Sequence, residues 1–194
     1  EAVVQTRVLT PDGPLAVPTD GVVRVKGGTT HDIDLGALPP GAYAVQVRAD
    51  LPIVAAVMAE RRAAAPGQSD LGWMAATAPV GTLAGTPLPP AATLGDGAHS
   101  TLLLVGTAAS WSAAVFVVGA DGVVSTHSAG GNADTVQSID VSGASAVWVR
   151  PATGTVRAGL AIEVPDAAGP LFSMVGLAPA ALTATEVPVR EIRR

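Results

Sequence analysis

The stretches AYAVQVR (42–48) and ASAVWVR (144–150) carry the same alternation of residues about a hundred positions apart. Successive side chains of a β-strand point to opposite faces of its sheet, so each stretch predicts a strand with a valine face and a mixed face. Upstream of each, TRVLTPDG (6–13) and VFVVGADG (115–122) also match. The matched stretches occur in the same order, which indicates an internal duplication.

A third pair of stretches, WMAATAPVGTLAGTPLP (73–89) and SMVGLAPAALTATEVPV (173–189), extends the duplication towards the end of the chain. Between the copies, residues 86–99 are rich in Pro and Gly and low in charge, as expected at a domain boundary. We therefore predict two domains, residues 1–92 and residues 93–194.

Turn signals at short intervals predict an all-β fold. Asp12-Gly13 and Asp121-Gly122 each follow a strand-like run, and Asp-Gly tolerates the positive φ of tight hairpins. The 22 Gly and 16 Pro leave little room for helices. Short strands separated by turns point to two tandem immunoglobulin-like antiparallel β-sandwich domains.

Two regions of the first copy need separate interpretation. Residues 22–26 and 29–35 flank Gly27-Gly28, which predicts two strands around a tight turn. The alanine-rich stretch 55–65 could form a helix, but its repeat partner, residues 158–163, has a β pattern. We therefore predict a strand for the first half of that stretch.

The first copy is one strand short. The second copy has a strand-like stretch, residues 101–105, before its strand at 112–118, whereas the first copy begins at the equivalent of that later strand. An unpaired sheet edge promotes aggregation. We expect a segment upstream in the full protein to supply the opening strand of the first domain, with residues 183–189 as the alternative source.

The composition limits the classes of partner and site. The net charge is −5 and Lys and Arg are not clustered, which argues against a nucleic-acid partner. The absence of cysteine excludes thiol catalysis and zinc–thiolate sites. No apolar run in the chain approaches the roughly 20 residues that span a bilayer.

The histidines do not indicate a catalytic or metal site. His31, His99 and His127 lack the spacing of metal ligands, and we predict that they are solvated or packed in loops. A triad of His127 or His99 with Asp140 and a serine stays open, although no nucleophile motif accompanies it.

The acidic residues have a structural interpretation too. Asp32 and Asp34 share a strand face, and paired carboxylates can serve glycoside hydrolysis. Only Asp34 has a repeat partner, Asp140, so we predict that both cap backbone amides at turns. The stretch GGNAD (130–134) resembles a calcium loop, but it occurs once and is predicted to be a hairpin loop. We predict no catalytic residue, metal or cofactor.

Trp148 is the residue that the duplication singles out. Val147 and Val149 form the predicted core face, so Trp148 should point outward, at the position where the first copy has Gln46. An outward tryptophan indicates a contact surface for sugar, lipid or protein; the alternative is that it packs against the other repeat or the linker. The predicted interaction surface comprises Trp148, Arg150, Gln46 and Arg48. The other tryptophans, Trp73 and Trp111, are predicted to pack in the core or at sheet edges.

The phrases VAAVMAER, DLGWMAATAP and GPLFSMVGLAP resemble an uncharacterised family of actinobacterial exported or membrane-anchored proteins, a domain-of-unknown-function group. The resemblance implies an N-terminal membrane anchor, an extracytoplasmic β-rich body and a link to cell-envelope glycan assembly. It carries no catalytic residues.

These observations together predict a non-enzymatic extracytoplasmic scaffold or partner-binding subunit of the cell envelope, secreted or anchored through a segment outside this chain. Its expected partner is a membrane or envelope protein, such as a glycosyltransferase, or the missing N-terminal part of the same protein. A glycan-binding module and a surface-assembly subunit completed by a donated strand stay open as alternatives.

Overall fold

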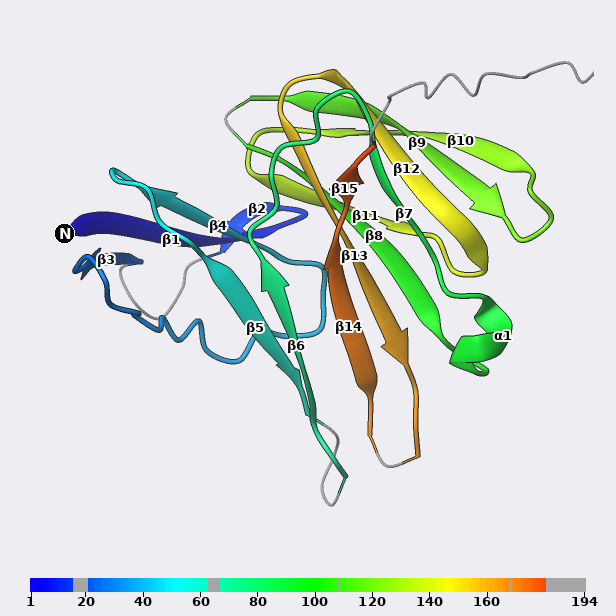
Figure 1. Cartoon of the computed structure of the whole chain (residues 1–194), viewed down its shortest axis with the longest axis horizontal. Helices are drawn as coiled ribbons and strands as arrows, with labels where there is room; N and C mark the ends of the chain where they lie inside the picture. Colours follow the sequence, from blue (N-terminus) through cyan, green and yellow to red (C-terminus); the bar gives the residue numbers. More distant parts are fainter. Residues whose placement is uncertain (16–20, 63–66, 108, 168, 181–194) are drawn as a thin grey trace, which may run out of the picture.

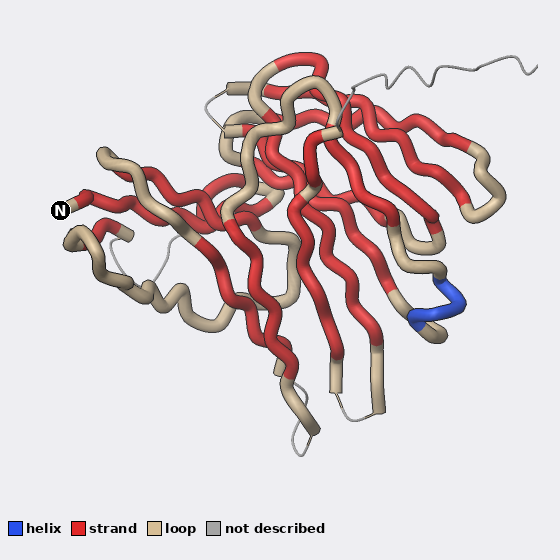
Figure 2. The backbone as a smooth tube through the Cα atoms, viewed as in Figure 1, coloured by secondary structure: helices blue, strands red, loops and turns tan. Residues whose placement is uncertain are grey.

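The computed structural model describes residues 1–15, 21–62, 67–107, 109–167 and 169–180. Strands make up nearly all of the regular structure, which confirms the all-β class (Figures 1 and 2). The described part of the chain contains one short helix, α1 (Ala91–Leu94). It holds no helix long and apolar enough to cross a membrane.

The second half of the chain forms an antiparallel β-sandwich. One sheet has five strands in the order β10 (Val124–Gly131), β9 (Trp111–Gly119), β12 (Ala144–Thr153), β7 (Ala84–Pro87) and β15 (Ala178–Pro179). The other has four, in the order β11 (Thr135–Asp140), β8 (His99–Gly106), β13 (Val156–Val164) and β14 (Leu171–Gly176).

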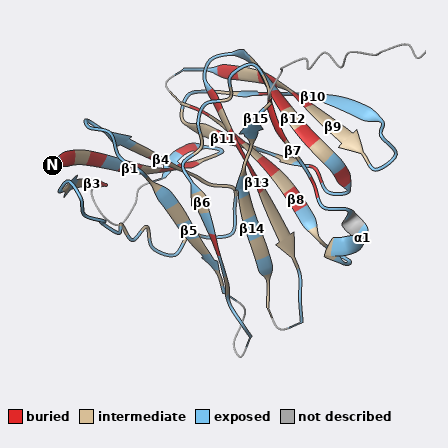
Figure 3. Ribbon diagram, in the orientation of Figure 1, coloured by how far each residue is buried: buried red, intermediate tan, exposed pale blue. Residues whose placement is uncertain are grey.

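The core lies between these two sheets (Figure 3). Alternate residues of the central strands are fully buried there because each strand turns one face inward. The fully buried side chains include Leu102, Leu104, Val115, Val147, Val149 and Val156. The core is therefore built from aliphatic residues of medium size, as expected from a sequence with few aromatics.

Strands from both predicted repeats contribute to this sandwich. β13 follows β12 in sequence but pairs with β8 in the other sheet, whereas β7, which precedes the predicted boundary, pairs with β12. The two predicted repeats are thus joined by strand pairing as well as by sequence order. The immunoglobulin-like connectivity stays a prediction.

The first half is organised around β1 (Ala2–Thr10). Strands β2 (Gly13–Leu15) and β3 (Val22–Val25) pair along one edge of β1, and β4 (Ala44–Ala49) pairs along the other. The hairpin of β5 (Ala56–Arg61) and β6 (Asp70–Ala75) lies beside β14 of the second half (Figure 1). The predicted boundary between residues 92 and 93 stays a prediction.

The duplication is visible in the strand register. Thr6 pairs with Val47 between β1 and β4, and the equivalent Val115 pairs with Val149 between β9 and β12. The predicted hairpin at Asp12-Gly13 forms between β1 and β2, and the one at Asp121-Gly122 forms between β9 and β10. The prediction of a strand in the first half of residues 55–65 is also confirmed.

The second predicted strand after Gly27-Gly28 is wrong. The turn is present, with Gly28 at φ +77°, but residues 29–35 form no strand. Their repeat counterpart, β11, pairs with β8. Among the described residues the first half has no strand equivalent to β8, as the comparison of the copies predicts, so residues 29–35 have no partner strand. The alternative source of that strand, residues 183–189, lies outside the described residues.

Candidate binding face

Trp148 lies on the outer face of the five-stranded sheet. Its neighbours Val147 and Val149 are 0% exposed, which confirms the predicted core face of β12. Across the sheet, Trp148 pairs with Phe116 of β9 on one side and with Gly85 of β7 on the other. Cross-strand neighbours on one face lie close enough for their side chains to interact.

The indole of Trp148 covers Gly85. A Cβ atom built on Gly85 would collide with the indole ring and with the carbonyl oxygen of Val147. Glycine at position 85 therefore lets the large side chain lie close to the sheet. Trp148 thus packs against a strand of the first repeat, as the alternative interpretation expects, and remains partly exposed.

Arg150 completes this surface. Its guanidinium carbon lies 5.3 Å from the centroid of the Phe116 ring, which is within the range of a cation–π contact. No ion pair among the described residues includes Arg150. We call Phe116, Trp148 and Arg150 the aromatic face. Sequence reasoning missed Phe116. The alternation along β9 turns its side chain to the outer face of the sheet, because the neighbouring Val115 is buried on the inner face.

The other two predicted surface residues, Gln46 and Arg48, lie elsewhere. They flank Asp134, which follows β10. Arg7 donates to the Asp134 carboxylate at 2.9 Å, Gln46 donates to it at 3.3 Å, and Arg48 lies 4.0 Å from it. Gln46 is only 9% exposed. The structure therefore brings Trp148 together with Arg150, and Gln46 together with Arg48, in two separate clusters.

Asp134 was part of the calcium-loop alternative. Its carboxylate contacts the cationic side chains of Arg7 and Arg48, and its amide donates to the carbonyl of Gly106 at 2.8 Å. The described residues contain no group of three His, Asp or Glu side chains that could hold a metal ion. The loop thus joins the two halves of the chain through a charged contact.

The duplicated aspartates cap turns, as predicted. Asp34 accepts a hydrogen bond from the amide of Gly36 at 2.8 Å, and Asp140 accepts one from the amide of Ser142 at 2.9 Å. Asp140 also accepts the Ser142 hydroxyl, at 2.6 Å. These hydrogen bonds hold the pKa of Asp140 below its ordinary value, because they stabilise its charged form; the bond from the Ser142 hydroxyl has the larger effect and the bond from the Ser142 amide the smaller one. The charge of His99 lowers the pKa further. The ring of His127, the other histidine of the possible triad, lies near a different residue: its Nε2 atom is 3.3 Å from the Ser125 hydroxyl oxygen.

The remaining tryptophans differ from each other. Trp111 is 3% exposed and belongs to the core cluster, as predicted. Trp73 is 62% exposed on β6, a strand of the two-stranded sheet, so it lies on an edge strand and the prediction of a core position is wrong for this residue. Trp73 pairs with Met58 on a face of the hairpin that the second half leaves uncovered.

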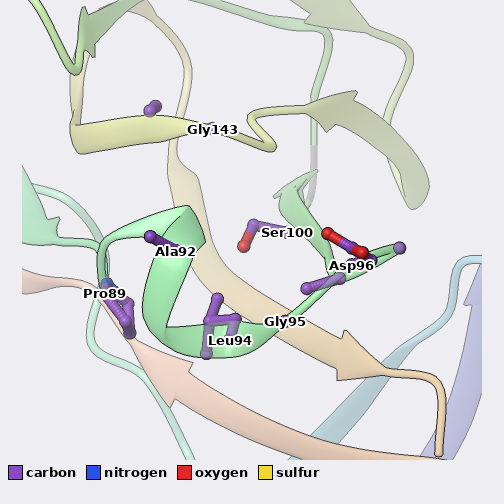
Figure 4. A pocket seen from close by; sticks show the side chains of 10 residues that line it. Pro89, Ala92, Leu94, Gly95, Asp96, Ser100 and Gly143 are labelled. Carbon is purple, nitrogen blue, oxygen red and sulfur yellow. The ribbon is translucent and has the colours of Figure 1, made fainter.

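A cavity of about 350 Å³ lies beside α1 (Figure 4). Its lining combines small residues of the linker with Gly143 and Ala144 at the start of β12. The Ser100 hydroxyl points into it, and Asp96 lies at its rim. Among the residues that line the cavity, Asp96 is the only one with an ionisable side chain.

Comparison with known proteins adds a family without a described activity. No curated protein and no solved structure matches the chain. The model of one family, described as a family of unknown function, matches residues 1–152. That span covers β1 to β11 and all but the last residue of β12, including all three residues of the aromatic face. The chain therefore belongs to the family of unknown function DUF5719.

Proposed function

We propose that this protein is a non-enzymatic binding module that holds a partner on the aromatic face. One observation carries the proposal: the equivalent face of the first half already holds a segment of chain. Phe116, Trp148 and Arg150 occupy the positions that Arg7, Gln46 and Arg48 occupy in the first half. Asp134 lies against those three first-half residues.

The chemistry of the aromatic face specifies the partner. Arg150 matches Arg48, which faces the Asp134 carboxylate, so the partner should present a carboxylate to Arg150. Phe116 and Trp148 replace polar residues of the first half, and their rings favour an apolar surface next to that carboxylate. A protein segment carrying an aspartate or glutamate fits these requirements.

The cellular setting belongs to the same proposal. We place the protein outside the cytoplasm, at an actinobacterial cell envelope, secreted or held by a segment outside this chain. The similarity of VAAVMAER, DLGWMAATAP and GPLFSMVGLAP to actinobacterial exported or membrane-anchored proteins supports this setting. Protease accessibility on intact cells tests it: digestion without lysis is expected, and protection until lysis would contradict an extracytoplasmic location.

A glycan is the second candidate ligand. The partly exposed indole of Trp148 offers a flat apolar ring on which a sugar could stack, next to the cationic Arg150. An acidic glycan would meet the same chemical requirements as an acidic protein segment. Titration with soluble envelope glycans, followed by intrinsic fluorescence, separates the two: a change that depends on Trp148 favours the glycan.

The decisive variant is Trp148→Gln, which installs the residue found at this position in the first half. Partners that co-purify from native membranes and are identified by mass spectrometry should be lost with this variant and with Arg150→Gln. The matched control is Trp73→Gln, which changes the exposed tryptophan of β6 and should leave capture unchanged. Capture of the same partners by wild type and Trp148→Gln would overturn the proposal.

A further inference from the structure

The cavity beside α1 lies at one end of the sandwich, where the core stops. Ser100 is the first buried residue of β8, and Leu102 and Leu104 follow it on the same inward face, fully buried. Ala144, at the start of β12, belongs to the core and lines the cavity from the opposite sheet. The cavity volume of about 350 Å³ is within the range of small-ligand sites. The end of an apolar core is therefore open to a molecule of small size.

Ser100 places a polar group in this wall. The residue is only 4% exposed, and its hydroxyl points into the cavity (Figure 4). Its backbone is satisfied, because its amide donates to the Ser142 hydroxyl oxygen at 3.0 Å and its carbonyl accepts the Val141 amide at 2.8 Å. The Ser100 hydroxyl itself has no hydrogen-bond partner among the described residues. Buried polar side chains are ordinarily hydrogen-bonded, so this hydroxyl is free to bond to a molecule in the cavity.

The charges around the cavity favour a cation. Asp96, at the rim, carries the single ionisable side chain of the lining. Asp140 lies behind the wall: it accepts the Ser142 hydroxyl at 2.6 Å, and the oxygen of that hydroxyl accepts the Ser100 amide. The charge of His99 acts on Asp140 in the opposite direction, but His99 does not line the cavity. The two carboxylates thus make the surroundings of the cavity negative.

We propose that this cavity binds a small organic ammonium ion that also carries a hydroxyl group. The ammonium pairs with the Asp96 carboxylate at the rim, and the ligand hydroxyl forms a hydrogen bond with Ser100. The carbon skeleton of the ligand lies against Leu94 and Ala144. Because the rim carboxylate is exposed and its charge is screened by solvent, binding depends on the three contacts together. The site goes beyond the proposed function, since no residue of the aromatic face lines the cavity.

The probe that tests this site is trans-4-aminocyclohexanol, which combines an ammonium, a hydroxyl and an apolar ring. Two analogues each lack one group: cyclohexanol lacks the ammonium, and cyclohexylamine lacks the hydroxyl. Titration into ¹³C-labelled full-length protein at about pH 7, where alkylamines are charged, should give saturable shifts in the methyl signals of Leu94, Ala98 and Ala144. Each analogue should bind about fivefold more weakly than the probe, because it loses one of the polar contacts.

Two variants separate the polar contacts. Asp96→Asn should weaken the binding of both amines by about fivefold and leave that of cyclohexanol unchanged. Ser100→Ala should weaken the binding of both alcohols by a similar factor and leave that of cyclohexylamine unchanged. The matched control is Asp12→Asn, which removes the same charge from the exposed turn between β1 and β2 and should leave all three affinities unchanged.

A third variant tests the cavity itself. Ala98→Leu fills part of the space without removing either polar group, so it should abolish the shifts with all three probes, and its thermal unfolding verifies that it is folded. Equal affinities for the probe and cyclohexanol, equal effects of Asp96→Asn and Asp12→Asn, or no saturable shift with any probe would each overturn the proposal. Trp148→Gln should leave these affinities unchanged, so the result is separate from that of the aromatic face.

Discussion

At position 85 the lack of a side chain determines how Trp148 can lie. The indole covers the glycine backbone, so the aromatic face depends on a residue in a different strand and a different repeat. Gly in a strand interior often marks such a close approach. The outward direction of Trp148 could be predicted from the valines on either side of it. Its contact with Gly85 could not, because alternation along one strand does not reveal which strand becomes its neighbour.

We expect Gly85→Ala to lower the free energy of unfolding by about 1–3 kcal/mol, the usual range for overpacking. The added methyl group would collide with the Trp148 indole. In a Trp148→Ala background the same change should cost less, because part of the obstacle is gone. Urea unfolding of the four proteins in this double-mutant cycle measures the coupling. An equal cost in both backgrounds would show that the Val147 carbonyl, and not the indole, excludes the methyl group.

At the scale of elements, the β5–β6 hairpin is held by contacts with a strand of the other repeat. Phe172 of β14 packs against Gly72, and its amide donates to the Asp70 carboxylate at 2.8 Å. Arg61 forms an ion pair with Glu163 and lies 6.0 Å from the Phe172 ring centroid. The two strands of this hairpin were predictable from alternation. Their position beside β14 was not, because it depends on these side-chain contacts and not on a backbone ladder.

The same reasoning explains the failure at residues 29–35. Their sequence suits a strand as well as that of β11 does, but a strand requires a neighbour to satisfy its backbone groups. In the second half β8 supplies that neighbour. The alternation of residues 29–35 therefore predicts a strand, but no strand forms because the described first half contains no equivalent of β8 to pair with it.

Phe172→Ala should loosen the hairpin without disturbing the sandwich. An isolated two-stranded hairpin is marginal in water, so β5 and β6 depend on the contact with β14. A loss of about 1–2 kcal/mol there corresponds to roughly tenfold faster hydrogen exchange of amides in 56–61 and 70–75. Amides of β8 and β9 should stay protected. As a control, Phe116→Ala removes an aromatic ring of the other sheet and should leave the exchange of the hairpin unchanged.

At the scale of the whole molecule, the sequence span matched by the family ends before the last strands of the sandwich. The match ends at residue 152, just before β13 and β14. β13 pairs with β8 along eight residues and contributes Val156, Ala158 and Leu160 to the core. The sandwich that presents the aromatic face is therefore completed by strands outside the matched span.

A protein comprising residues 1–152 should fail to fold cooperatively. Without β13 and β14, β8 loses a neighbour and the core loses two large buried side chains, Val156 and Leu160, each worth about 1.5–3 kcal/mol. Together with the lost strand pairing, this approaches the roughly 5–15 kcal/mol net stability of an ordinary domain. Thermal unfolding followed by circular dichroism should show a broad, non-cooperative change for residues 1–152 and a sharp transition for residues 1–180. A sharp transition in the shorter protein would mean that β1 to β12 form a self-sufficient core and that β13 and β14 only extend it.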